Sequence, residues 1–191
     1  DGTTCTSRTF DVYINFPREV SYGKSTFVTV GNSGTILTST DGTSWDNRTS
    51  GTSARLDEII YGNSTFVTVG NNGTILTSMD GTTWTSRTSG TTENLRGVMY
   101  GSSTFVVVGK LGTVLTSTDG TTWTSRTSGT TENLIGLTYA NGTFMTVGES
   151  GTILSSLDGT TWTSRNSGTS KSLEYVIYGN SKFITVGESG T

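Results

Sequence analysis

Histidine is absent from the 191-residue chain, and cysteine and proline occur once each. Without histidine, the usual general base near neutral pH is missing, and a Ser-His-Asp triad or a histidine-bearing zinc site is excluded. The single cysteine, Cys5, excludes an internal disulfide and leaves the redox compartment open. These absences argue against an enzyme, and we expect no catalytic residue, no metal site and no cofactor.

Charge is also scarce, with 12 Lys and Arg against 15 Asp and Glu and a formal net charge of −3. That balance provides no basic patch for nucleic acid. No apolar run approaches the roughly 18 residues of a membrane span. We therefore expect neither nucleic-acid binding nor a membrane-spanning segment. The chain starts at Asp1 without an initiator Met or a signal peptide, which suggests a processed chain or an excerpt of a longer one.

Glycine, serine and threonine are abundant instead, and apolar residues come in short bursts such as "TFVTVG" and "TILTS". Thr, Val, Ile, Phe, Tyr and Trp are strand formers, whereas Gly with Asn or Asp supplies turns. The bursts lack helical periodicity and are too regular for a disordered linker. The composition therefore predicts an all-β fold.

An Asp-Gly-Thr triplet recurs with a period of about 39 residues, which is the mark of a repeat architecture. Four strands are predicted within one period, with hairpin-sized loops between them, at residues 95–100, 104–109, 113–117 and 122–127. Four antiparallel strands in this length are typical of a β-propeller blade, and a β-solenoid is the rival. We predict one propeller domain over 1–191, of about five blades. The triplets begin at Asp1, Asp41, Asp80, Asp119 and Asp158.

The segments "STDGTSW", "SMDGTTW", "STDGTTW" and "SLDGTTW" resemble the Asp-box of bacterial neuraminidase repeats. They are also similar to the repeats of photosystem II stability/assembly factor-like propellers. The resemblance covers almost the whole chain and implies a propeller fold. Enzymes, lectins and scaffolds share this signature, so it does not by itself imply one activity.

The two ends of the chain complete each other only in part. The chain begins with the sequence of a fourth strand and ends with the first two strands of a unit, so the last blade is expected to mix strands from both termini and to lack its third strand. Three explanations compete for the missing strand. The chain is an excerpt, another copy donates the strand in head-to-tail assembly, or the blade tolerates the gap.

The Asp and Trp of each triplet segment are interpreted as structural repeat residues. An Asp before Gly between two strands accepts backbone N–H bonds, Gly takes the positive φ, and Trp fills the space between strands. A metal or glycosidase role for the Asp is the rejected alternative. The residues are Asp41, Trp45, Asp80, Trp84, Asp119, Trp123, Asp158 and Trp162.

One arginine per unit follows the Trp position by three residues. Sialidases bind the substrate carboxylate with three arginines that occupy non-equivalent positions around the pocket. The arginines of this chain instead recur at one equivalent position, on the predicted outer strand of each unit. We therefore favour a charged rim that discourages aggregation. They are Arg8, Arg48, Arg87, Arg126 and Arg165.

Multivalent sugar binding is the alternative function, because five-bladed propellers include lectins. The loops after the second strand, such as Asn71-Asn72 and Lys110-Leu111, differ between units, which speaks against a repeated site. Four Asn-x-Ser/Thr sequons are candidate glycosylation sites if the protein is secreted, at Asn47, Asn63, Asn72 and Asn141.

The segment "FDVYINFPREV" departs most from the repeat. Alternation of Phe10, Val12, Ile14 and Phe16 predicts a strand with one buried face, which Pro17 ends or confines to a sheet edge. These four residues and Cys5, which replaces the repeated Trp, are candidate assembly contacts. The apolar ridge either covers the last blade or docks on another subunit.

We conclude from the sequence that the chain is a non-catalytic structural and interaction module, extracellular or on a cell surface, self-assembling through its incomplete terminal blade. Its expected partners are other copies of itself or another surface protein, and glycans in the lectin alternative. A third hypothesis, an assembly factor that binds a protein partner across one face, rests on the family resemblance alone.

Overall fold

The computed structural model describes residues 16–191, and these residues form antiparallel strands joined by turns and short 3-10 segments. The strands make four sheets of four strands and one sheet of two, and neighbours in each sheet are consecutive in the chain. The predicted all-β class and the predicted four-stranded unit are confirmed for this part of the chain.

Each four-stranded sheet repeats one pattern of strand lengths, with a long first strand and a fourth strand of three residues. The strands are β1 (Pro17–Gly23), β2 (Thr26–Gly31), β3 (Ile36–Ser39), β4 (Asp46–Arg48), β5 (Leu56–Gly62), β6 (Thr65–Gly70), β7 (Ile75–Ser78), β8 (Thr85–Arg87), β9 (Leu95–Gly101), β10 (Thr104–Gly109), β11 (Val114–Ser117), β12 (Thr124–Arg126), β13 (Leu134–Ala140), β14 (Thr143–Gly148), β15 (Ile153–Ser156), β16 (Thr163–Arg165), β17 (Leu173–Gly179) and β18 (Lys182–Gly187).

The fourth strand is shorter than the sequence predicts. In the third unit the predicted strand covers residues 122–127, whereas β12 has only Thr124–Arg126. The backbone N–H of Thr122 donates to Asp119 at 2.9 Å, so this residue belongs to the preceding turn and cannot pair with β11. The capped turn therefore takes the residues that strand propensity assigned to the strand.

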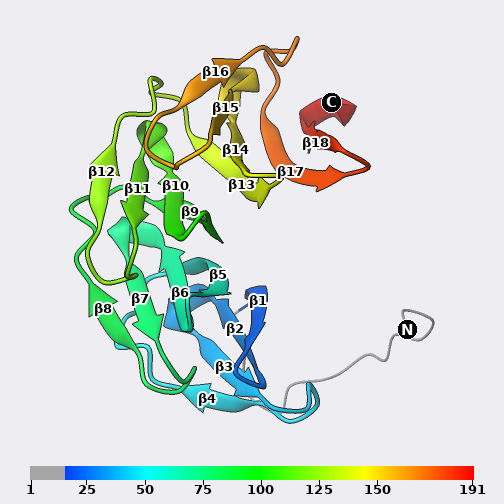
Figure 1. The fold of residues 1–191 in the computed structure, drawn as a ribbon. Helices are drawn as coiled ribbons and strands as arrows, with labels where there is room; N and C mark the ends of the chain where they lie inside the picture. Colours follow the sequence, from blue (N-terminus) through cyan, green and yellow to red (C-terminus); the bar gives the residue numbers. More distant parts are fainter. Residues whose placement is uncertain (1–15) are drawn as a thin grey trace.

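The five sheets are arranged along an arc, with the first strands β1, β5, β9, β13 and β17 on its inner side and the fourth strands on its outer side (Figure 1). Each first strand contacts the first strand of the next sheet. Every sheet therefore presents its faces to its neighbours rather than to a separate layer.

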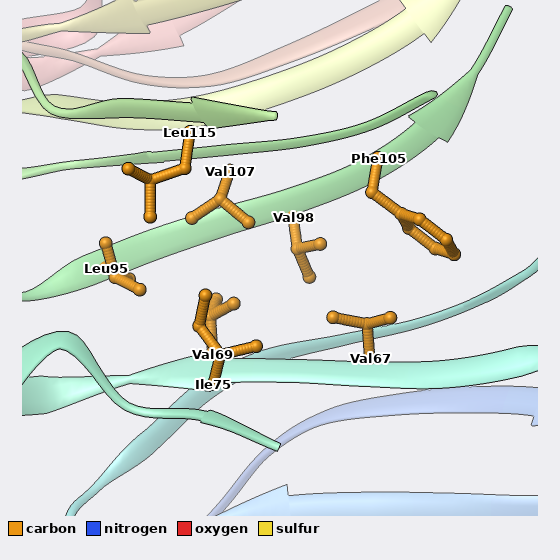
Figure 2. Packing of buried hydrophobic residues seen from close by; sticks show 8 residues of the cluster. All are labelled: Val67, Val69, Ile75, Leu95, Val98, Phe105, Val107 and Leu115. Atoms are coloured by element: carbon orange, nitrogen blue, oxygen red, sulfur yellow. The ribbon is translucent and has the colours of Figure 1, made fainter. Parts of the chain in front are cut away.

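The apolar core lies between the sheets. One cluster joins Val67, Val69 and Ile75 of the second sheet to Phe105 and Val107 of the third, and all five are fully buried (Figure 2). A sheet that lies between two others buries both of its faces in this way. This explains apolar runs such as "FVVV", because a strand with one solvent-exposed face would alternate apolar and polar residues.

At three joints, a tyrosine of one first strand packs on the glycine that ends the preceding first strand. The Tyr100 side chain lies so close to Gly62 that a Cβ added at Gly62 would be 2.5 Å from the tyrosine Cβ, and Gly23 and Gly101 face Tyr61 and Tyr139 in the same way. Only a residue without a side chain permits this approach. The glycine that ends the first strand therefore serves the contact between sheets, and the fourth joint has Ala140 in its place.

The N-terminal prediction is tested only at its end. Cys5, Phe10, Val12 and Ile14 lie outside the described residues. Phe16 is 73% exposed with φ of 48°, so it does not belong to a buried face. Pro17 is the first residue of β1, and the strand predicted before it lies outside the described residues. Proline, which has no N–H to donate, is accommodated at the first position of an edge strand, as the edge alternative required.

Within residues 16–191, no helix has the length and apolar character needed to cross a membrane.

Candidate binding site

The repeats differ at the start of each first strand. The second residues of these strands are Arg18, Asp57, Arg96, Ile135 and Glu174, and the third residues are Glu19, Glu58, Gly97, Gly136 and Tyr175. All of them except Gly97 line a hollow of about 810 Å³, which we call the inner hollow. Unlike residues therefore converge on one place in an otherwise repetitive molecule.

A buried ion cluster occupies one side of the inner hollow. The Asp57 side chain is only 5% exposed, and its carboxylate lies 3.0 Å from Arg18 Nε, 3.1 Å from Arg55 Nε and 3.4 Å from Arg96 Nη1. Arg18 belongs to β1 and Arg96 to β9, so one carboxylate on β5 links three sheets. Burial raises the pKa of Asp57, and the positive charges of Arg55 and Arg18 oppose that rise.

Glu58 lies beside this cluster without a counterion among the described residues. Its burial, with repulsion from Glu19 and Asp57, raises the pKa of Glu58 to about 8. Its Oε2 is 3.7 Å from the position that a Cβ on Gly97 would occupy, so the carboxyl group faces the next first strand. The Glu19 side chain also makes no ion pair within residues 16–191, and its Oε1 accepts the backbone N–H of Val20 at 3.1 Å.

The other side of the inner hollow carries apolar residues beside Glu149 and Glu174. Ile135 is half-buried, Leu137 is buried, and Tyr175 is 67% exposed on β17. Gly136 stands between them, at the repeat position that Glu58 occupies on β5. The hollow therefore combines unpaired carboxyl groups with apolar walls, which suits a ligand with both a polar and an apolar part.

The predicted repeat aspartates lie in the turns between the third and fourth strands. Asp80 Oδ1 accepts from the backbone N–H groups of Thr82 and Thr83 at 2.8 Å each, and Ser78 Oγ accepts from Gly81 N at 2.8 Å. Asp41, Asp119 and Asp158 make equivalent bonds. The same turn forms four times, and every one of these aspartates is exposed.

These bonds stabilise the ionised form of each aspartate. Hydrogen bonds from the side chain and backbone of the second residue after it, and from the backbone of the third, hold the pKa of Asp41, Asp119 and Asp158 below the usual range. For Asp80 the largest effect comes from the backbone of Thr83. The carboxylates are thus engaged in capping turns.

The repeated tryptophans are half-buried against the core between sheets. Trp84, Trp123 and Trp162 each pack on a different apolar cluster. Each indole N–H donates to the glycine carbonyl of its own turn, as Trp84 Nε1 does to Gly81 at 3.0 Å. Trp45 is also half-buried.

The repeated arginines end the fourth strands, on the outer edge of each sheet. Arg87 Nε donates to Thr77 Oγ1 at 2.8 Å, and Arg48, Arg126 and Arg165 bond the equivalent hydroxyl. Three of them line similar polar hollows of about 700, 770 and 580 Å³, on the second, third and fourth sheets. We call these the rim hollows; their one charged lining residue is the arginine.

The sequon asparagines Asn47, Asn63, Asn72 and Asn141 are all exposed. Within residues 16–191, no group of three or more Cys, Asp or Glu side chains is arranged to hold a metal ion. Glycosylation at the four positions stays a prediction.

The inner hollow is not among the sites that the sequence predicted. The prediction rested on the loops, which vary between repeats, and took the strands as a constant framework. The missed signal was present in "PREVSYG", "LDEIIYG", "LRGVMYG", "LIGLTYA" and "LEYVIYG", where the second, third and fifth positions vary while the fourth stays aliphatic and the sixth stays tyrosine. Comparison of strand positions, rather than loops, could have found the site.

Radially arranged, four-stranded antiparallel sheets around inner first strands define a β-propeller. Two solved structures of YCF48 share this fold. YCF48 bound to a D1 peptide is 17% identical with a TM-score of 0.71, and the match covers 90% of this chain and 60% of that one. YCF48 from Cyanidioschyzon merolae is 15% identical with a TM-score of 0.70, covering 92% and 65%.

The chain thus spans 60% and 65% of the length of the two YCF48 chains. No family model matches the sequence, and no curated protein matches it. The comparisons confirm the propeller fold, whereas membership of an Asp-box family stays a prediction.

Proposed function

We propose that the chain is a non-catalytic scaffold that binds a segment of a partner protein in the inner hollow. The observation that carries the proposal is the convergence on that hollow of unlike residues from successive first strands. Residues needed only for folding would repeat there as they do elsewhere, because each sheet packs on its neighbours in the same way.

The likeness to YCF48 supports this proposal over an extracellular structural role. One of the matched structures is bound to a D1 peptide, so a propeller of similar shape accepts a peptide. The size of the inner hollow, about 810 Å³, is within the range of roughly 300–1,000 Å³ found for small-ligand pockets and fits a few side chains of a segment. Self-association and a cell-surface location stay predictions.

An array of immobilised random peptides, probed with the fluorescently labelled chain, tests the proposal. The diagnostic variant is Ile135→Arg, which fills the apolar side of the hollow. Arginine is native at the equivalent positions 18 and 96, so the fold accepts it. Ser125→Arg, on the exposed outer strand β12, is the matched control.

We expect selective peptide binding by the parent and by Ser125→Arg, and loss of that binding in Ile135→Arg. A chain that binds no peptide, or binds the same peptides equally well in both variants, would overturn the proposal.

A second candidate function is multivalent glycan binding, because the rim hollows are equivalent in three successive units. Hydroxyl groups and one oriented guanidinium line each of them, as in Ser125, Arg126 and Thr127. A sugar carboxylate or sulfate suits such a group. On a glycan array, this function predicts binding that Arg126→Ala weakens and Ile135→Arg leaves unchanged; absence of signal on every glycan class removes it.

A further inference from the structure

The two ends of the arc expose apolar surface. The first sheet and the two-stranded β17–β18 sheet each pack on one other sheet, whereas the sheets between them pack on two (Figure 1). Ile177, Ile184 and Val186 are exposed on the β17–β18 sheet, and Val20 and Tyr22 are exposed on β1. We call the first three residues the trailing face and the other two the leading face.

The joint between the second and third sheets shows how such faces pack when they meet. Its core joins Val67 and Val69 of the second sheet to Val98 of the third, and Tyr100 packs against the same cluster. The three valines are fully buried. The other three joints bring equivalent apolar positions together.

The exposed faces carry the residues of such a joint without its packing. Ile184 and Val186 stand at the repeat positions of the two second-sheet valines, yet each is 52% exposed. Val20 stands at the repeat position of Val98 and is also 52% exposed. The trailing face therefore has the side chains of one half of a joint, and the leading face has those of the other half.

A glycine and a tyrosine complete the match. At the joint between the second and third sheets, Tyr100 lies against Gly62 so closely that no side chain would fit there. Gly179, at the same repeat position on β17, has no atom within 4 Å of an added Cβ. Tyr22, at the repeat position of Tyr100, is 58% exposed. The place for a tyrosine is thus open at one end of the arc, and a tyrosine without its glycine stands at the other.

The charges at the two ends are also complementary. Neighbouring first strands form ion pairs between their second residues, since Asp57 lies 3.0 Å from Arg18 and 3.4 Å from Arg96. The second residue of β17 is Glu174, which is exposed and forms no ion pair within residues 16–191. If β17 lay beside the β1 strand of another copy, Glu174 would neighbour Arg18, a residue of opposite charge.

We propose that the trailing face of one copy of the chain docks on the leading face of a second copy, so that copies associate head to tail. The contact places Tyr22 of one copy on Gly179 of the other, as the internal joints do. Such a heterologous contact repeats from copy to copy and gives a ring or a filament. The inference goes beyond the proposed function and does not depend on it, because a single copy has the complete inner hollow.

Sedimentation equilibrium of the chain at concentrations up to about 100 μM measures the association, and this range detects contacts of micromolar affinity. We expect an average mass that rises with concentration above the 20.2 kDa of one chain. Gly179→Tyr fills the open glycine position, which accepts a side chain because its φ is not positive. Val20→Asp places a carboxylate where the internal joints are apolar. Each variant alone should keep the mass of one chain.

Two substitutions on exposed outer strands are the matched controls. Thr163→Tyr on β16 and Ser125→Asp on β12 add the same side chains away from both faces. Both should associate as the parent does, and the circular dichroism of every variant reports its folding.

Mixing the two blocked variants tests the head-to-tail polarity. Gly179→Tyr keeps its leading face and Val20→Asp keeps its trailing face, so an equimolar mixture should form pairs of twice 20.2 kDa and nothing larger. Association of either variant alone as strongly as the parent would overturn the proposal, since the altered face would then not be needed. A parent chain that stays monomeric up to about 100 μM, or a mixture that forms no pairs, would overturn it as well.

Discussion

The outer half of each sheet and the start of its first strand follow opposite rules. In the outer half, the turn aspartate, the tryptophan and the arginine recur with the same hydrogen bonds from unit to unit. At the start of the first strand, two adjacent positions vary between units, and all but one of these residues line the inner hollow. Repetition thus marks what the fold requires of every unit, and variation marks what one place in the molecule requires.

The largest expected effect concerns the Asp57 cluster. Its residues vary between units, yet we expect them to stabilise the fold. Asp57→Ala should lower the free energy of unfolding by about 3 kcal/mol, because it leaves three partly buried arginines without their common partner. Urea denaturation measures the loss. Asp46→Ala, which breaks the exposed pair with Arg48, should cost less than about 1 kcal/mol. Equal losses in the two variants would contradict a structural role for the cluster.

A second prediction concerns the joints between sheets. Gly62→Ala should destabilise the protein by about 2 kcal/mol, because the new methyl group would overlap Tyr100 and force the sheets apart. Gly179→Ala is the matched control, since the same repeat position on β17 has no atom within 4 Å and the change should be nearly neutral. Thermal unfolding of both variants decides, and a stable Gly62→Ala would mean that the joint is loose.

The third prediction uses pH. The pKa of Glu58 is raised from 4.5 to about 8, so the folded protein binds this proton more tightly and loses stability as the pH rises from about 4.5 through 8. Glu58→Gln removes that loss, and the variant should exceed the parent by about 1 kcal/mol or more at pH 9 while matching it near pH 4. If the difference in the free energy of unfolding between parent and variant stays constant from pH 4 to pH 9, the surroundings of Glu58 do not destabilise its ionised form.

The smallest effect belongs to the repeated turn. Asp80→Ala should cost about 1 kcal/mol, the usual loss for a side chain that caps backbone N–H groups. Because the pKa of this aspartate is depressed, its contribution is present above pH 3.8 and declines as the pH falls further. Asp119→Ala should cause a similar loss in urea denaturation, and markedly unequal losses would show that the turns are not equivalent.

The sequence predicted the repeated part of the molecule well. Period and composition indicated the four-stranded unit, and the Asp-Gly pair indicated a turn whose bonds Asp80 makes. The outer strands were predicted too long, because residues such as Thr122 have strand propensity but bond to the turn. Strand propensity is a property of a single residue type, whereas the hydrogen bond that caps the turn depends on an aspartate three residues earlier in the chain.

The inner hollow could not be predicted from spacing. Arg18, Asp57 and Arg96 are each about 39 residues apart, and only the lateral packing of first strands brings them within hydrogen-bonding distance. The cluster also includes Arg55, which precedes its strand and lies outside the repeat position. Contacts between units depend on the angle between sheets, which no pattern within one unit specifies.

The most direct test of the account is a map of backbone amide chemical shifts in the chain as the best peptide from the array is added. We predict that the shifts cluster at the starts of β1, β5, β9, β13 and β17, around Glu58 and Ile135. Shifts confined to the outer strands and the rim hollows, around Arg87 and Arg126, would contradict the assignment of binding to the inner hollow.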